Sequence, residues 1–134
     1  MLKIAVFGTG HLGKFHLNNW LEIPGVELVG FFDPDDHNAK AVEDKYHIKR
    51  FTDAQELIDA CDAVDIVAPT IHHFTLCAAA LRKGKHVFVE KPLAMTSAEA
   101  DELATLLVDL ADQDRLSRES IAAAEAAVQA LPGD

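Results

Sequence analysis

The chain has 134 residues, 49% of them hydrophobic and 25% charged, which is typical of one globular domain. Its formal net charge of −10 excludes a surface that follows nucleic-acid phosphates, because such a surface needs clustered lysine and arginine. No apolar run approaches the ~18 residues of a membrane span, and Met1-Leu2-Lys3 leads into the first expected strand without a secretory signal. Cys61 and Cys77 form no C-x-x-C pair, which favours reduced core thiols. We therefore expect a cytoplasmic protein that contacts neither nucleic acid nor membrane.

The first expected element is a strand, a tight turn and the start of a helix. An apolar run at 3–7 is followed by Gly8, Gly10 and Gly13 in the spacing G-x-G-x-x-G. In a dinucleotide-binding turn the first glycine permits the bend, the second lets backbone approach a pyrophosphate, and the third allows close helix–strand packing. The helix N-terminus then offers N–H groups and partial positive charge to the phosphates. Three such glycines also arise by chance, but their place between strand and helix favours dinucleotide binding over an ordinary glycine-rich turn.

Strands and helices alternate along the rest of the chain, as apolar runs separated by glycine, proline and aspartate indicate. Further strands are expected at 26–32, 47–51, 63–68 and 86–89, and helices at 14–21, 38–46, 54–60 and from after residues 69–73 to Lys83, where Gly84 ends the last one. This alternation predicts an α/β fold, a Rossmann-type doubly wound parallel sheet of about five strands with right-handed crossovers.

An acidic cluster, Asp33-Pro34-Asp35-Asp36, follows the second strand. In a dinucleotide-binding fold an acidic residue about 20 residues beyond the glycines bonds the adenosine ribose hydroxyls, and Asp33 fits that place. Asp35 or Asp36 could instead cap the next helix. No arginine or serine directly follows Asp33 to hold a 2′-phosphate, so we expect NAD as cofactor, with NADP less favoured.

Ligands of such sheets bind beyond the carboxyl ends of the strands. The glycine turn, Asp33, residues 69–73 and Glu90-Lys91 all fall at those ends, so four separate features mark one edge. His11 and His16 lie near the first helix, but a spacing of five residues is not a metal-binding motif, and each is more typical of a capping or surface group. We expect no metal site.

Four stretches together resemble the glucose-fructose oxidoreductase and inositol dehydrogenase (Gfo/Idh/MocA) family. They read V-F-G-T-G-H-L-G, F-F-D-P-D, A-P-T-I-H-H-F and A-L-R-K-G-K-H-V-F-V-E-K-P-L-A, and the resemblance covers about residues 2–108. It implies an NAD(P)-binding domain of enzymes that mostly oxidise or reduce sugars and polyols.

The same resemblance implies roles for individual residues. The cofactor-binding residues would be Gly8, Thr9, Gly10, His11, Leu12 and Gly13 at the pyrophosphate, Asp33 at the ribose, and Pro69, Thr70, His73, Glu90 and Lys91 along the rest of the cofactor. Lys91 matches the catalytic lysine of the family's E-K-P motif, beside the nicotinamide and the substrate hydroxyl. Read from its residue type alone, Lys91 could equally be a solvated loop lysine before Pro92.

The chain departs from the family after a helix expected at 97–110, which begins with the capping box Thr96-x-x-Glu99. We divide it into a dinucleotide-binding domain, 1–110, and an acidic, alanine-rich helical tail, 111–134. In the tail an apolar stripe on a helix from about 118 to 131 is formed by Ile121, Ala124, Val128 and Leu131. We expect this helix to pack on the domain or across a homodimer; the alternative is a frayed acidic tail.

The sequence thus predicts the NAD-binding domain of a sugar or polyol oxidoreductase, without the family's substrate domain and without turnover alone. One alternative is a small working oxidoreductase that completes its site through another subunit. A second is a regulatory module that senses the nicotinamide pool. A homodimer could form through the terminal helix or through the edge of the strand at 86–89.

Overall fold

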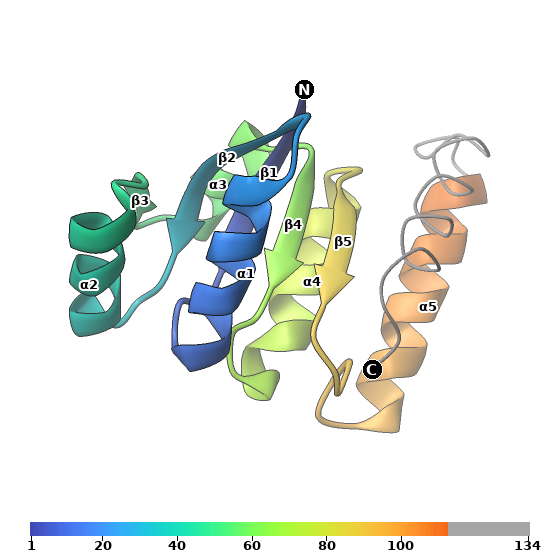
Figure 1. Cartoon of the computed structure of the whole chain (residues 1–134). Helices are drawn as coiled ribbons and strands as arrows, with labels where there is room; N and C mark the ends of the chain where they lie inside the picture. The colour runs from blue at the N-terminus through green and yellow to red at the C-terminus, as the bar shows by residue number, and fades with distance from the viewer. Residues whose placement is uncertain (113–134) are drawn as a thin grey trace.

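The computed structural model describes residues 1–112, which form a five-stranded sheet with helices on both faces (Figure 1). The strands are β1 Leu2–Phe7, β2 Val26–Phe32, β3 Arg50–Phe51, β4 Ala63–Ile66 and β5 His86–Val89. Their order is β3-β2-β1-β4-β5, and every neighbouring pair is parallel. The predicted Rossmann-type α/β fold is confirmed, with the strand order reversing direction between β1 and β4.

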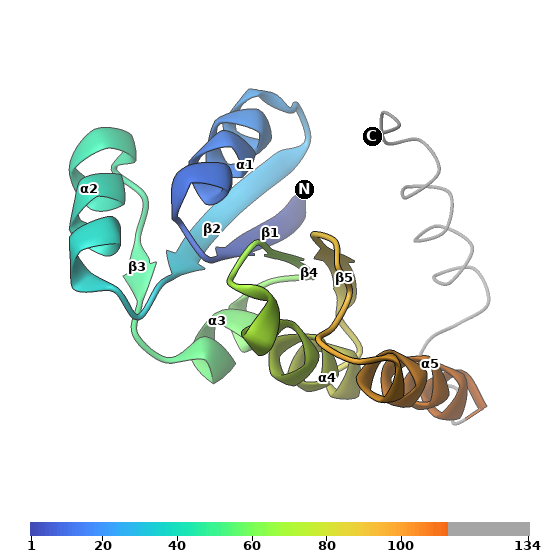
Figure 2. The same ribbon diagram turned by 90° about the horizontal axis from the view of Figure 1, so that it is seen from below.

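The helices divide between the two faces of this sheet. They are α1 His11–Glu22, α2 Asp36–Tyr46, α3 Ala54–Ala60, α4 His73–Arg82 and α5 Ser97–Asp112, with a short 3-10 helix, η1, at Thr70–His72. Figure 2 shows α1 and α2 on one face and α3, α4 and α5 on the other. Within residues 1–112 no helix is both long and apolar enough to cross a membrane.

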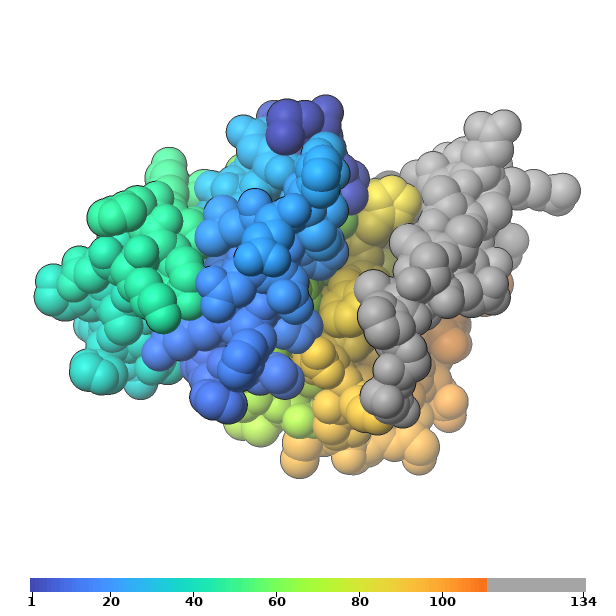
Figure 3. All heavy atoms as spheres, viewed as in Figure 1, coloured from blue at the N-terminus to red at the C-terminus, as the bar shows by residue number. Residues whose placement is uncertain are grey.

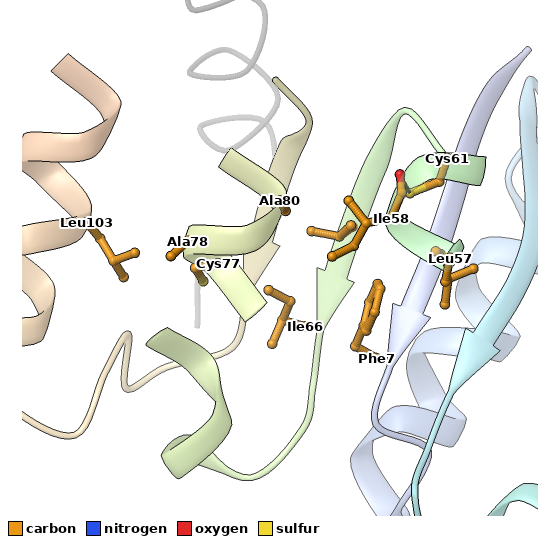
Figure 4. Close-up of a cluster of buried hydrophobic side chains, with 11 residues drawn as sticks. Phe7, Leu57, Ile58, Cys61, Ile66, Cys77, Ala78, Ala80 and Leu103 are labelled. Atoms are coloured by element: carbon orange, nitrogen blue, oxygen red, sulfur yellow. Dashed lines mark hydrogen bonds between the residues drawn. The ribbon is translucent and has the colours of Figure 1, made fainter. Parts of the chain in front are cut away.

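Each face of the sheet has its own apolar core, because side chains alternate between faces along a strand. Val6 and Phe31 pack with Leu17 of α1 on one side. Phe7 and Ile66 pack with residues of α3 and α4 on the other, where Leu103 brings in α5 (Figure 4). Since fully burying one such side chain is worth about 1.5–3 kcal/mol, these two cores hold the strand ends that carry the site in fixed positions.

Local signals place several helix ends correctly. Asp35 caps α2 by accepting a hydrogen bond from the Asn38 backbone N–H at 2.9 Å. Asp53 likewise caps α3, accepting from the Gln55 N–H at 2.8 Å. α1 begins three residues before the predicted Lys14, because Gly10 of the glycine turn is itself the N-cap.

The strand predicted at 47–51 is much shorter in the structure. His47 has φ 56°, a left-handed conformation that ends α2, so it cannot start a strand. Only Arg50 and Phe51 pair with β2. The strand predicted at 63–68 also ends earlier, at Ile66, where the chain turns out toward η1.

The helix α5 extends to Asp112, two residues past its predicted end and past the proposed domain boundary at residue 110. Its first turn contains the predicted capping box in a slightly different form. Thr96 Oγ1 accepts from the Glu99 N–H at 3.1 Å, and the Glu99 carboxylate accepts from the Met95 N–H rather than from that of Thr96. The predicted terminal helix and its apolar stripe lie outside the described residues.

Both cysteines are buried free thiols, as their sequence context predicts. Burial raises the pKa of Cys61 and of Cys77 to about 11. At pH 8 only about one thiol in a thousand is then a thiolate, the form that reacts. We expect an aromatic disulfide reagent that reacts with free thiols to label neither cysteine in the native chain and both in guanidinium chloride. Rapid labelling of either thiol in the native chain would contradict this burial.

Candidate functional site

Four chain segments meet at one edge of the sheet, beyond the carboxyl ends of its parallel strands. They follow β1, β2, β4 and β5 and carry every residue that the sequence analysis assigns to the site. Figure 2 shows the molecule from this side. The edge lies where the strand order reverses between β1 and β4, the usual ligand position in open α/β sheets.

In the glycine turn, residues 8–13, only one of the three motif glycines has open space where a side chain would lie. Gly8 has φ +100°, and a Cβ there would lie 2.5 Å from the Ala68 backbone nitrogen. A Cβ on Gly13 would collide with the carbonyl oxygen of Gly8. A Cβ on Gly10 would meet nothing within 4 Å. Two glycines are therefore required by the fold, whereas Gly10 borders open space, so the turn fits a pyrophosphate.

The helix α1 starts at this open side. Gly10 is its N-cap, no side chain caps it, and its first turn carries no acidic residue. The first backbone N–H groups of a helix have no partner within the helix and carry its partial positive charge. His11 and Leu12 supply two of these groups, and the Leu12 side chain is exposed. The surface is suited to an anion.

Asp33 is buried and directed toward the glycine turn. Its Oδ2 accepts hydrogen bonds from the Thr9 backbone N–H at 2.9 Å and the Thr9 hydroxyl at 2.7 Å, and its Oδ1 accepts from the Asp35 N–H. Thr9 is fully buried, so its side chain holds Asp33 rather than lining the surface. These bonds fix the tip of β2 against the glycine turn and use three of the carboxylate's roughly four acceptor positions.

An arginine that the sequence analysis did not consider lies beside Asp33. Arg50 Nη2 donates to the Asp33 carbonyl oxygen at 2.9 Å and to Asp36 Oδ1 at 2.8 Å. Its Nε is buried and has no hydrogen-bond partner among residues 1–112. Arg50 lies on β3, so the pairing of β3 with β2, and not the residues that follow Asp33, brings its guanidinium group close to Asp33.

The segment after β4 contains Pro69, Thr70 and His73, and the structure buries the last of these. Pro69 precedes η1, which begins at Thr70. The His73 ring lies between two backbone carbonyls, with Nδ1 2.8 Å from the Pro92 oxygen and Nε2 2.7 Å from the Ala68 oxygen. His73 therefore links the segment after β4 to the segment after β5.

The segment after β5, Glu90-Lys91-Pro92, is also tied to α1. His16 Nε2 lies 2.8 Å from Glu90 Oε1, and His16 Nδ1 lies 2.7 Å from Asp65 Oδ2 on β4. Trp20 Nε1 donates to the same Asp65 oxygen at 2.7 Å. In Figure 3 the blue surface of α1 adjoins the yellow surface of the β5 region.

These contacts favour the cationic form of the His16 ring. Both of its nitrogens face carboxylate oxygens, which only accept, so both bonds form when both nitrogens carry protons. The bond to Asp65 raises the pKa of His16 above its ordinary value of 6.5, and Glu90 raises it further against the opposing effect of burial. Among residues 1–112 no group of three or more histidine, cysteine, aspartate or glutamate side chains is arranged to hold a metal ion.

The sequence analysis treated His16 as an ordinary capping or surface residue, which was wrong. The available signal was Asp65, a carboxylate in the middle of the apolar strand A-V-D-I-V-A. A buried charge needs a partner, so an unexplained aspartate in a central strand predicts a basic or N–H-bearing side chain on the facing helix. His16 and Trp20 are those partners.

Comparison with known proteins agrees with this geometry. Residues 2–114 match the family model described as Oxidoreductase family, NAD-binding Rossmann fold (Gfo/Idh/MocA). The chain belongs to this family. The resemblance inferred from the four sequence stretches is thereby confirmed, and residues 1–112 are a Gfo/Idh/MocA NAD-binding Rossmann domain.

Several relatives in the Gfo/Idh/MocA family are about one-third identical to this chain. UDP-N-acetylglucosamine 3-dehydrogenase of Acidithiobacillus ferrooxidans is 35% identical over 102 residues, covering 76% of this chain and 32% of that protein. The NAD(+)-dependent scyllo-inositol 2-dehydrogenase of Bacillus subtilis is 36% identical over 103 residues, covering 74% and 30%. The chain therefore spans about a third of the length of these relatives.

Solved structures show the same architecture. The myo-inositol 2-dehydrogenase of Lactobacillus plantarum matches with a TM-score of 0.74 and 32% identity, covering 81% of this chain and 33% of that one. A biliverdin reductase from Synechocystis, in complex with biliverdin and NADP+, matches with a TM-score of 0.76 and 27% identity, covering 81% and 35%. The Gfo/Idh/MocA fold is thus found in proteins with different nicotinamide cofactors.

Proposed function

We propose that the chain supplies the cofactor-binding domain of an NAD-dependent oxidoreductase that acts on a sugar or polyol hydroxyl. The observation that carries this proposal is the glycine turn, in which Gly8 and Gly13 admit no side chain while Gly10 faces open space. Such a turn at a helix N-terminus accommodates the pyrophosphate of a dinucleotide. Relatives named as inositol and UDP-N-acetylglucosamine dehydrogenases support the sugar or polyol class.

In this proposal, different residues at the carboxyl edge of the sheet bind different parts of the cofactor. The glycine turn with His11 and Leu12 would hold the pyrophosphate, Asp33 the ribose, and Pro69, Thr70, His73 and Glu90 would border the nicotinamide half. The nicotinamide ring, when bound, supplies a hydride acceptor. His73 would act through its bonds to the Ala68 and Pro92 carbonyls, since its ring is buried.

Lys91 is the residue that we propose for the chemistry on the substrate. An alcohol that loses a hydride must also lose its hydroxyl proton, and a lysine beside the reacting carbon can orient that oxygen and share the proton. Lys91 directly follows Glu90, whose N–H continues the pairing of β5 with β4 through the Ile66 carbonyl at 3.0 Å. It therefore stands next to a backbone position that the sheet fixes.

We propose that the substrate contacts lie outside these 134 residues, since the chain spans about a third of the relatives it matches. The chain alone would then bind cofactor but catalyse no turnover. We place it in the cytoplasm.

Within the described residues β5 forms one edge of the sheet. An unpaired strand edge invites association, so we propose it as the surface where a second copy of the chain pairs.

The cofactor preference gives the sharpest test of the proposed binding mode. The buried Asp33 carboxylate would repel a 2′-phosphate, and an interaction of about 1.4 kcal/mol changes affinity tenfold. We expect the unmodified chain to bind NAD more tightly than NADP in calorimetric titrations. Asp33→Asn, which removes the charge but little volume, should reduce the ratio of the two affinities about tenfold.

Asp35→Asn is the matched control. It removes a charge two residues away, and asparagine caps a helix as well as aspartate does, so α2 should be unaffected. Its NAD-to-NADP ratio should stay close to that of the unmodified chain. Equal affinities for the two cofactors in the unmodified chain would contradict the assignment and would instead point to Arg50, whose Nε has no partner in the described chain, as a holder of the 2′-phosphate.

A further inference from the structure

The bond between His16 and Glu90 joins two parts of the site that are otherwise held by different strands. α1 begins at the glycine turn and packs mainly on β1 and β2. Glu90 follows β5, which pairs with β4 at the other side of the sheet. His16 and Glu90 are 74 positions apart in the sequence, so only this tertiary contact brings them together.

Asp65 holds the His16 side of the His16–Glu90 contact in place. Asp65 is fully buried on β4, and its Oδ2 receives both the His16 ring and the Trp20 indole N–H. The Phe88 ring on β5 packs against His16 in an edge-to-face arrangement, with ring centroids 6.0 Å apart. Within residues 1–112 the charged groups recorded around the imidazole are Asp65 from β4 and Glu90 after β5. A cation fixed by Asp65 therefore presents its second N–H to Glu90.

Lys91 lies between two such attachments. On its N-terminal side the Glu90 carboxylate is bonded to His16, and on its C-terminal side the Pro92 carbonyl is bonded to His73. His73 is in turn bonded to the Ala68 carbonyl, and the Ala68 backbone is what a Cβ on Gly8 would meet first. The residues on both sides of Lys91 are thus held by contacts to the segments that surround the glycine turn.

We propose that His16 is a positioning residue, which fixes the Glu90-Lys91-Pro92 segment relative to the helix that begins at the glycine turn. This inference rests on the proposed cofactor site and adds a division of labour to it. The glycine turn would bind the ADP half of the cofactor independently of His16, whereas the nicotinamide half would depend on the segment that His16 holds. Small displacements of a positioned group have large effects on a site of this kind.

The test compares intact NAD with ADP-ribose, which lacks nicotinamide, by calorimetric titration of the 134-residue chain. His16→Gln should weaken NAD binding about tenfold, because the segment beside the nicotinamide half loses its fixed position, and leave ADP-ribose binding nearly unchanged. His37→Gln, on the exposed part of α2, is the control and should leave both affinities unchanged. An equal loss for both ligands, or no loss for either, would show a merely structural role and overturn the proposal.

A second variant keeps the test valid if the core around Asp65 does not tolerate glutamine at position 16. Glu90→Ala leaves the His16, Asp65 and Trp20 contacts in place and breaks the His16–Glu90 contact, together with the contact that Glu90 itself would make with the nicotinamide half. The double variant should lose about as much NAD affinity as the more affected single variant, because both changes break the same contact. Additive losses would mean that Glu90 and His16 act separately, which would overturn the proposal.

The pH profile supplies a readout that a structural role would not move. The titration of His16 can be followed by NMR of its ring protons. In the unmodified chain the ratio of NAD affinity to ADP-ribose affinity should fall as the pH rises through this titration. In His16→Gln the same ratio should stay constant over the same pH range. A ratio unaffected by the His16 titration in the unmodified chain would overturn the proposal. If the unmodified chain bound neither ligand, the proposed function itself would fail; if it bound both and the variants did not alter the ratio, only the role of His16 would fail.

Discussion

Replacing Gly13 with alanine is expected to lower the free energy of unfolding by about 3 kcal/mol or more. The added Cβ would collide with the carbonyl oxygen of Gly8, and neither backbone can yield without moving α1 away from the end of β1. A domain of this size has only about 5–15 kcal/mol of stability, so the loss would be visible as a clear shift of the urea transition.

Gly10→Ala is the control for this variant. It introduces the same methyl group three residues earlier, where nothing lies within 4 Å. Its stability should stay within about 1 kcal/mol of the unmodified chain, since Gly10 caps α1 without a side-chain hydrogen bond that the substitution could remove. If Gly13→Ala were as stable as Gly10→Ala, the close packing of helix and strand described above would be wrong.

Removing the Asp65 carboxylate should have an effect of similar size. Asp65→Ala leaves the Trp20 N–H and the His16 ring without their common acceptor inside the protein. Breaking a buried ion pair by removing one partner typically costs about 3–5 kcal/mol. Asp59→Ala is the control: Asp59 pairs with Lys83 at 2.7 Å but is largely exposed, so its loss should cost about 1 kcal/mol or less.

The Asp65 effect should also depend on pH in a defined direction. The pKa of His16 is raised in the folded chain, so the stability that it contributes is fully present below 6.5 and is lost as pH rises through the folded pKa. The difference in unfolding free energy between the unmodified chain and Asp65→Ala should therefore shrink as pH rises above 6.5. A difference that grew with pH would contradict a cationic His16.

The sequence was sufficient for the elements whose signals are local. The strands Val26–Phe32 and His86–Val89 have the predicted bounds, because each is a mainly apolar run between a glycine or charged residue at either end. The helix Ala54–Ala60 has its predicted bounds because Asp53 caps its first turn. Parallel pairing of such runs then placed the glycine turn, Asp33 and Glu90-Lys91 at one edge. These positions follow from periodicity and from the handedness of the crossovers.

Contacts between distant segments could not be predicted in the same way. His16 reaches Asp65 across 49 positions and Glu90 across 74, and nothing in the residues around His16 specifies either distance. The third strand is shorter than predicted for a related reason, because the length of an edge strand depends on its pairing with β2, and only Arg50 and Phe51 make that pairing. Arg50 approaches Asp33 only through that pairing.

The central claim is that residues 8–13 bind the pyrophosphate of a nicotinamide dinucleotide, and calorimetric titration of NAD into the unmodified chain and into Gly10→Ala tests it most directly. We predict saturable binding at one site in the unmodified chain. Gly10→Ala should keep the same unfolding transition and bind NAD at least about tenfold more weakly, because its methyl group occupies the open space that the phosphates would approach. No saturable binding by the unmodified chain, or unimpaired binding by Gly10→Ala, would contradict the account.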